Sequence, residues 1–271
     1  MIAFAANSLL CRLALQHGAI DAASFSSIRL VSGALALALI VRMRAGPSPA
    51  RSGEWLAAAM LFAYVACFSF AYVSLSAGTG ALILFGAVQV TMCLAGWRAG
   101  EAFGRLGGIG FAAAVAGLVA LVLPGVTAPS PSGAMLMAAA GVAWGIYSLR
   151  GRGVGDPLAA TAGNFLRATP LALAMSLLLA GLARAAPAGA LLAVVSGAIT
   201  SGIGYVLWYA ALRGLPALRA AAVQLSVPPL AAFGGVLWLG EAITPRLAGA
   251  SAAILGGIAL VLAGRAQRPR R

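Results

Sequence analysis

The chain has 271 residues, of which 62% are apolar and 8% charged, with a mean hydropathy of +1.00 and a formal net charge of +13. A water-soluble domain carries roughly 25% charged residues, because its surface must face water. The composition therefore excludes a soluble globular protein and indicates an integral membrane protein.

Arginine, proline and glycine divide the chain into ten apolar segments, and each is predicted to form a membrane-spanning helix. In chain order they cover residues 1–16, 22–41, 55–75, 79–97, 105–123, 133–149, 158–182, 187–212, 217–239 and 247–264. Stretches of about 20 apolar residues match a hydrocarbon layer ~30 Å thick. They are too long and too uniformly apolar for barrel strands, so helices are the expected form. The first segment is short for a span, as it would be if the true start lay a few residues upstream.

All eighteen basic residues are arginine, and most lie between the apolar segments. With the N-terminus in the cytoplasm, thirteen arginines fall on the cytoplasmic side and only Arg184 and Arg246 fall outside, while three lie within spans. Cytoplasmic loops carry such an excess. The bias predicts a multi-pass inner-membrane protein with both termini in the cytoplasm. Nucleic acid is not an expected partner, because no basic face carries interleaved aromatic residues.

Two parts of the chain resemble each other at an offset of about 140 residues. WRAGE, ending on Glu101, aligns with LWLGE, ending on Glu241. With a few residues of slippage, FAYVSL (70–75) aligns with LWYAAL (207–212), and Arg29 aligns with Arg167.

This repeat divides the chain into two five-helix units, residues 1–131 and 132–271. An odd number of spans per unit turns the second unit upside-down relative to the first. Inverted repeats of this kind are typical of transporters whose substrate site lies near mid-membrane between the halves. The predicted fold is an all-α integral membrane protein of ten transmembrane helices, arranged as two inverted five-helix repeats.

Several stretches of the second unit resemble the drug/metabolite transporter superfamily in its ten-helix, EamA-type branch. They are AWGIYSLRG (143–151), WYAALRGLPALRAAAVQLSVPPLAAFGGVLWLGE (208–241) and the glycine-rich GASAAILGGIALVLAG (249–264). The resemblance covers essentially the whole chain and is stronger in the second unit. In the first unit Gln89 replaces a proline that is present as Pro229, and Phe4-Ala5 stands where Trp144-Gly145 has its counterpart. The resemblance implies movement of metabolites or drugs across a membrane, often export, with substrates too varied to transfer to this chain.

The five acidic residues all lie at or beyond the ends of predicted spans. They are Asp21, Glu54, Glu101, Asp156 and Glu241. Proton-coupled pumps usually need an ionisable carboxylate or histidine in the pathway. The four-helix multidrug pumps of the same superfamily rely on such a buried glutamate. Neither proton coupling through a mid-membrane carboxylate nor selection of a lipophilic cation by one is therefore expected here.

Glu101 and Glu241 have two interpretations. Each can be a gate charge that closes against Arg105 or Arg246, respectively. Each can also be a helix-terminal residue, solvated at the lipid interface and paired with a nearby arginine, where exposed pairs contribute only ~0–1 kcal/mol.

Arg29 and Arg167 lie inside predicted spans, where a charged residue costs about 2.5–3.5 kcal/mol on insertion scales. In a functional interpretation they favour anionic or carboxylate-bearing substrates. In a structural one they bind freed backbone carbonyls, for example near Pro170, or extend toward an interface. Arg12 is expected to be an interface anchor.

Polar and aromatic residues inside the spans form the candidate substrate pocket. In the first unit they are Asn7, Ser8, Tyr64, Phe68, Tyr72, Gln89 and Thr91, and in the second Trp144, Tyr147, Arg167, Tyr205, Trp208, Tyr209, Gln224 and Ser226. Apolar walls with a few placed hydrogen-bonding groups suit small amphipathic metabolites. The alternative places the Tyr and Trp side chains in interfacial belts.

Three prolines are candidate hinges. Pro170, Pro228 and Pro229 lie inside predicted spans, where they free backbone carbonyls for a ligand or for bending.

Groups for enzyme chemistry are scarce. The only histidine, His17, lies in an outer loop, and Cys11, Cys67 and Cys93 lie in separate apolar runs. We expect no enzyme, no cofactor and no metal site. The predicted function is secondary transport of small metabolites, either amino-acid-like compounds or drugs, by alternating access, as export or exchange. The expected partners are membrane lipid and a small-molecule substrate. A passive channel and a non-transporting scaffold are the alternatives.

Overall fold

A computed structural model describes residues 1–44, 52–98, 104–123, 125, 128–151, 154–208, 224 and 226–266. Its helices in chain order are α1 (Ile2–Gln16), α2 (Ala22–Met43), α3 (Trp55–Tyr72), α4 (Ala77–Arg98), α5 (Arg105–Val122), α6 (Pro131–Arg150), α7 (Pro157–Leu178), the 3₁₀ turn η2 (Ala180–Leu182), α8 (Pro187–Val195), the π-helical η3 (Ser196–Ile203), α11 (Val227–Leu239) and α12 (Pro245–Ala266). Within these residues, β-structure is limited to one isolated bridge between Ile20 and Ala185.

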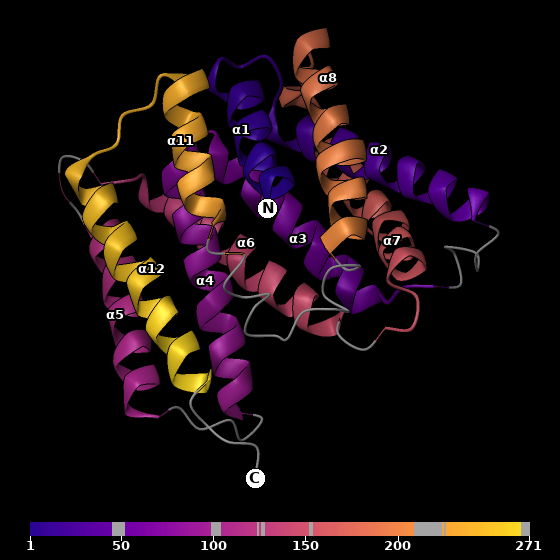
Figure 1. The fold of residues 1–271 in the computed structure, drawn as a ribbon. Coiled ribbons are helices and arrows are strands. Elements are labelled where there is room, and N and C mark those ends of the chain that lie inside the picture. The colour runs from indigo at the N-terminus through magenta and orange to yellow at the C-terminus, as the bar shows by residue number, and fades with distance from the viewer. Residues whose placement is uncertain are drawn as a thin grey trace.

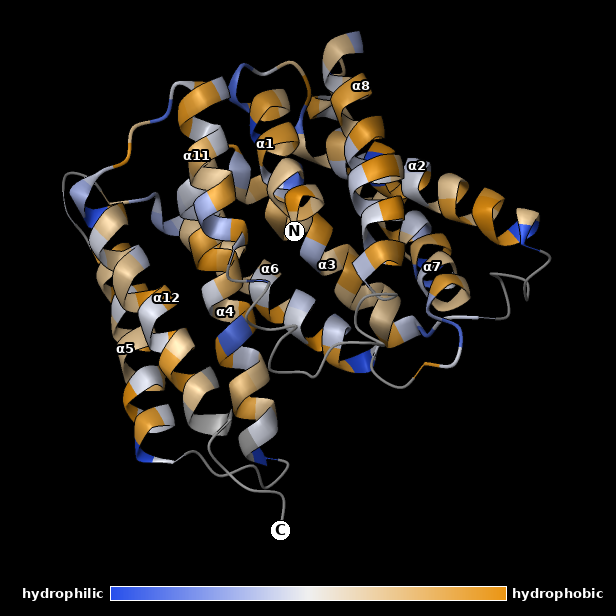
Figure 2. Cartoon of the chain, viewed as in Figure 1, coloured by the Kyte–Doolittle hydropathy of each residue, from blue (hydrophilic) through white to orange (hydrophobic). Residues whose placement is uncertain are grey.

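Six helical stretches of the described residues are long and apolar enough to cross a membrane. They are α2, α3, residues Ala77–Gly96 of α4, α5, α6, and the continuous stretch Pro187–Trp208 that contains α8 and η3. Apolar residues cover these helices along their length, and polar residues gather at their ends (Figure 2). The structure therefore confirms a helical membrane protein.

Capping side chains fix where two of the helices begin. Asp21 accepts hydrogen bonds from the backbone N–H groups of Ala23 and Ser24 at 3.0 and 2.9 Å. Asp156 caps α7 in the same way, with Pro157 in the first turn, where a missing N–H is harmless. The two caps lie at corresponding positions of α2 and α7.

The helices pack in antiparallel pairs that join distant parts of the sequence (Figure 1). At the start of α2, Ser27 donates to the carbonyl of Ala172 near the end of α7, at 2.8 Å. Arg246 at the start of α12 donates to the carbonyl of Leu123 at the end of α5, at 2.6 Å. α4 pairs similarly with α11, and α3 packs on α6.

The two aligned arginines lie at different distances from the starts of their helices. Arg29 lies eight residues after the Asp21 cap, whereas Arg167 lies eleven residues after the Asp156 cap. This difference is close to one turn of helix, which rises about 5.4 Å. The two side chains therefore do not occupy the same position relative to the caps.

The predicted segment boundaries agree with most of the helices to within a few residues, with two differences. Segment 158–182 ends as a helix at Leu178, and η2 follows it. Pro228 and Pro229 lie in the first turn of α11 and not in the interior of a helix, because α11 begins at Val227. Glu101, Tyr209 and the expected first part of segment 217–239, up to residue 223, lie outside the described residues.

Candidate functional site

A pocket lined mainly by aromatic side chains lies where five helical segments meet. Its walls are Phe4 of α1, Tyr64 and Phe68 of α3, Leu84 and Phe85 of α4, Trp144 of α6 and Tyr205, which follows η3. We call this the aromatic pocket. Its volume of about 10 Å³ is about that needed to hold one water molecule. The pocket is therefore contracted, and its own side chains fill it.

The rings of the aromatic pocket pack around Trp144. Its ring centroid lies 4.9 Å from those of Tyr64 and Tyr205 and 5.8 Å from that of Phe4. Phe4 and Trp144 meet edge to face at 79°. Such geometries are favourable for aromatic pairs, by about 0.5–1.5 kcal/mol beyond the area that they bury. These contacts stabilise the contracted pocket without a covalent or ionic link, so a ligand of similar character can replace them.

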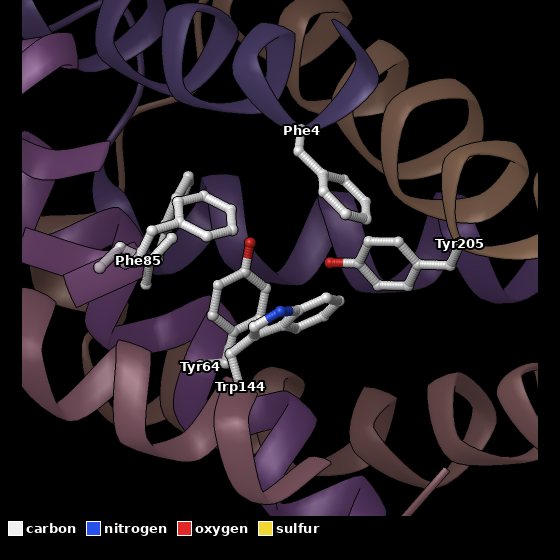
Figure 3. A pocket seen from close by; sticks show the side chains of 7 residues that line it. Phe4, Tyr64, Phe85, Trp144 and Tyr205 are labelled. Atoms are coloured by element: carbon white, nitrogen blue, oxygen red, sulfur yellow. The ribbon is translucent and has the colours of Figure 1, made fainter. Parts of the chain in front are cut away.

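Polar atoms of the pocket point toward one space. The hydroxyl groups of Tyr64 and Tyr205 both point into this space (Figure 3). The indole Nε1 of Trp144 is buried and has no hydrogen-bond partner among the described residues. Since an indole N–H can only donate, it favours a ligand with an acceptor atom.

Arg29 of α2 lies against the aromatic pocket and is fully buried, with 0% of its surface exposed. Its Nη2 donates to the Tyr64 hydroxyl at 3.2 Å, and its Nε donates to Ser201 Oγ at 3.0 Å. The guanidinium carbon lies 5.4 Å from the ring centroid of Tyr64 and 5.0 Å from that of Phe68. Nη1 is buried without a hydrogen-bond partner in the described part of the chain.

The π-helical segment η3 supplies the polar groups behind Arg29. Ser196 donates to Asn7 Oδ1 at 2.7 Å, Thr200 donates to the same oxygen, and Asn7 Nδ2 donates to Ser201 Oγ at 3.3 Å. π-helical turns are rare and occur frequently at functional sites. Gly197 of this segment lies against the backbone carbonyl of Arg29, so that a Cβ there would collide with it. The segment therefore fixes the position of Arg29.

None of the four described carboxylates pairs with Arg29. Asp21 and Asp156 cap helices, Glu54 pairs with Arg150, and Glu241 pairs with Arg12. A cation in mid-membrane costs about 2.5–3.5 kcal/mol on insertion scales. Two cation–π contacts, at roughly 0.5–2 kcal/mol each, offset much of this cost. The fold thus tolerates the charge of Arg29 without neutralising it.

Arg12 lies at the end of the bundle where α1, α3 and α11 end and α4 begins. Its Nε lies 3.3 Å from Glu241 Oε1, and its Nη1 donates to the carbonyls of Tyr72 and Val73 at 3.0 and 3.1 Å. Glu241 also accepts from the backbone N–H of Ala77, at 2.8 Å to Oε2. We call these five residues the Arg12 cluster. It ties three helix ends to the start of α4.

Comparisons with known proteins identify the family of the chain. The model of the EamA-like transporter family matches residues 131–263. A protein of Pseudomonas aeruginosa described as uncharacterized is 55% identical over 271 residues, which is all of this chain and 94% of that protein. The chain belongs to the EamA-like transporter family.

A solved crystal structure of another protein has the same fold as this EamA-like chain. The two superpose with a TM-score of 0.69 at 21% identity, over 97% of each chain. Membership of the family confirms the resemblance seen in the sequence. Since the EamA-like family consists of transporters, it also confirms that the chain is not an enzyme.

The aromatic pocket of this EamA-like chain contains four of the predicted site residues, namely Tyr64, Phe68, Trp144 and Tyr205. Tyr147 packs on Trp144 and Trp208 packs on Phe4, at centroid distances of 5.6 and 5.9 Å. Asn7 belongs to the polar network behind Arg29. The polar residues Ser8, Gln89 and Gln224 are buried outside the wall of the pocket.

Other predicted site residues do not line the pocket. The ring of Tyr72 packs on Phe68, with 4.7 Å between centroids, and its hydroxyl donates to the carbonyl of Ala77 within the Arg12 cluster, at 3.3 Å. Arg167 donates to the carbonyls of Ser52 and Gly163, so it holds the connection before α3. Ser226 is exposed at the start of α11, and Thr91 bonds to the carbonyl of Ala87 in its own helix. These positions fit the structural interpretation that the sequence left open for Arg167.

The ion pair of Glu241 fits one of its two interpretations, that of a helix-terminal residue beside a nearby arginine. Glu241 pairs with Arg12, and Nη1 of Arg246 donates to the carbonyl of Leu123 at the end of α5. Pro170 lies inside α7 as predicted, but it is exposed. Pro228 and Pro229 begin α11, where a proline leaves the helix straight.

Some residues of the site were not predicted. Phe4 was noted only as a departure from an expected tryptophan, and Leu84 and Phe85 lie in an unbroken apolar run. The hydroxyl residues Ser196 and Thr200 have a spacing of four, which places them on one face of a helix and is a signal that could have linked them to Asn7.

Proposed function

We propose that this EamA-like protein is a secondary transporter that moves small metabolites across the inner membrane by alternating access. The aromatic pocket is its substrate site. Export or exchange of amino-acid-like compounds or drugs is the proposed mode, with membrane lipid as the surrounding partner.

The proposed architecture is ten transmembrane helices in two inverted five-helix repeats, residues 1–131 and 132–271. Helices that lie five apart among the ten predicted spans pack on each other in opposite directions, namely α2 with α7, α4 with α11 and α5 with α12. The pairs α1 with α11 and α4 with α6 correspond to each other in the same way. An in-plane pseudo-two-fold axis would produce both patterns. The arginine bias of the loops supports two cytoplasmic termini.

The contracted pocket is the observation that carries the proposal. It lies between α1, α3 and α4 of the first repeat and α6 and the α8–η3 stretch of the second. Pockets for small molecules measure about 300–1,000 Å³, far more than the ≈ 10 Å³ seen here. The repeats must separate to admit a substrate, as alternating access requires. A passive channel would need a continuous path in place of a closed pocket.

Counterflow in proteoliposomes tests this function. Vesicles are loaded with an unlabelled solute and diluted into the labelled one, with a panel of neutral, cationic and anionic compounds. Saturable accumulation of at least one compound is expected. A channel would show neither accumulation nor saturation, and a scaffold would show no flux.

A pair of variants on one helix links the flux to the pocket. Leu84→Trp fills the aromatic pocket and should abolish counterflow, whereas Leu94→Trp, on an exposed position of α4, should leave it intact. Both variants are first checked for a single monodisperse species in detergent. Equal counterflow by a well-folded Leu84→Trp variant would refute the assignment of the pocket.

A further inference from the structure

We propose that the aromatic pocket selects a monocarboxylate with an apolar body, and that Arg29 provides the charge that selects it. This inference rests on the transport function proposed above and names the substrate class of the same site.

The first step is the charge balance of the site. Arg29 is fully buried, and the four described carboxylates lie in helix caps or in ion pairs with other arginines. The field of a charge is strong in an environment that excludes water. An anion that enters the pocket therefore meets one uncompensated positive charge, and a cation is repelled by it.

The second step is the supply of hydrogen-bond donors. Nη1 of Arg29 and Nε1 of Trp144 are buried without partners in the described part of the chain. Both groups can only donate. The Tyr64 hydroxyl accepts from Arg29 and lines the pocket. Two donors without partners and no paired carboxylate match the oxygen atoms of a carboxylate ligand.

The third step concerns the apolar walls. Aromatic rings such as those of Phe4, Phe85 and Trp144 also attract cations. Arg29 already occupies this role, because its guanidinium stacks on Tyr64 and Phe68. The remaining ring surface is left for an uncharged body that packs against it. One positive charge matches one negative charge, so a dianion such as a phosphate monoester would remain partly unneutralised.

The experiment compares three probes of one shape in detergent-purified protein. They are 3-phenylpropionate, its uncharged amide and 3-phenylpropylammonium, and their dissociation constants are measured by calorimetry. We expect the carboxylate to bind at least tenfold more tightly than the amide, and the ammonium ion more weakly than both. No saturable binding of the carboxylate, equal binding of acid and amide, or tighter binding of the ammonium ion would overturn the proposal.

Variants then assign the preference to Arg29. Arg29→Gln should bind acid and amide equally, and Arg29→Lys, which keeps the charge, should retain a preference for the acid. Arg42→Gln removes an exposed arginine from the same helix and should behave as the unmodified protein. Should Arg29→Gln not fold, the Arg29→Lys variant and the three probes still decide. A tenfold preference that survives in folded Arg29→Gln would overturn the assignment.

The result separates this inference from the proposed function. Selective binding of the carboxylate without counterflow in vesicles would leave the inference standing and remove the transport function. Counterflow of neutral or cationic solutes without a preference for the acid would support the transport function and overturn this inference.

Discussion

Arg12 and Arg29 are the same side chain in two regions of one bundle, and their surroundings differ in kind. Arg12 is half-buried at a helix end, with a carboxylate and two carbonyls as partners. Arg29 is fully buried at the centre, with two hydroxyl groups and two aromatic rings as partners. The charge of Arg12 is neutralised by Glu241. The charge of Arg29 is stabilised by hydrogen bonds and ring contacts but is not neutralised. We conclude that the first stabilises the structure and the second remains available to a ligand.

The largest expected difference is in stability. Arg12→Met leaves Glu241 and the carbonyls of Tyr72 and Val73 without their donor, and should lower the free energy of unfolding by about 2–3 kcal/mol. Arg29→Met removes an uncompensated charge and should leave the stability unchanged or higher. Apparent melting temperatures in one detergent give the comparison. A larger loss for Arg29→Met than for Arg12→Met would contradict the assigned roles.

A substitution in η3 tests whether this segment holds Arg29 in place. In Gly197→Ala the added methyl group meets the carbonyl of Arg29 and the hydroxyl of Ser32. The strain should lower stability by about 1–3 kcal/mol and weaken the binding of 3-phenylpropionate. Gly108→Ala is the control, since a Cβ there meets nothing within 4 Å, and it should not lower the melting temperature. Equal behaviour of the two variants would show that η3 does not hold Arg29.

Substitutions of two tyrosines of α3 distinguish the binding role of the Arg29 region from the structural role of the Arg12 cluster. Tyr64→Phe removes the acceptor for Arg29 Nη2, and should weaken binding of 3-phenylpropionate about three- to tenfold, as expected for one hydrogen bond of ~1 kcal/mol. Tyr72→Phe removes the hydrogen bond to the Ala77 carbonyl within the Arg12 cluster. It should lower the melting temperature slightly without weakening binding. Isothermal titration of both variants checks this, and the reverse pattern would contradict it.

The smallest expected effect is the pH dependence of the stability that the Asp21 helix cap contributes. Burial raises the pKa of Asp21, but hydrogen bonds from Ser24, Arg184 and Ala23 outweigh it and hold the pKa below its usual value. Its contribution to stability is therefore complete above about pH 4 and is lost as the pH falls through the lower folded-state pKa. Because the carboxylate is only partly buried, the effect is small.

Melting temperatures at successive pH values test this contribution. The difference between the unmodified protein and Asp21→Asn should shrink as the medium is acidified below pH 4. A difference that grows on acidification would show that the carboxylate is not stabilised in the folded state.

Hydropathy predicted the helices well, because only long apolar helices satisfy the backbone in lipid. Hydropathy could not show which apolar face of a helix packs against protein and which faces lipid. Lipid is as apolar as a protein core, so a buried Phe85 and an exposed Phe233 carry the same signal. Tyr64, Trp144 and Tyr205 stood out only because they combine a ring with a polar atom.

The positions of the two mid-span arginines were also beyond the sequence pattern. Their similar surroundings suggested equivalence, but the Asp21 and Asp156 caps set a register that differs by a turn. The π-helical segment that begins at Ser196 was not predicted, and its contact between Gly197 and the carbonyl of Arg29 joins residues far apart in the sequence.

Counterflow of labelled 3-phenylpropionate is the most direct test of the role of Arg29 in transport. Proteoliposomes preloaded with the unlabelled acid are prepared from the unmodified protein, Arg29→Gln and Arg42→Gln. We predict saturable accumulation by the unmodified protein and Arg42→Gln, and background levels with folded Arg29→Gln. Accumulation by Arg29→Gln at the rate of the unmodified protein would contradict the conclusion that the unneutralised charge at the centre of the bundle selects the substrate.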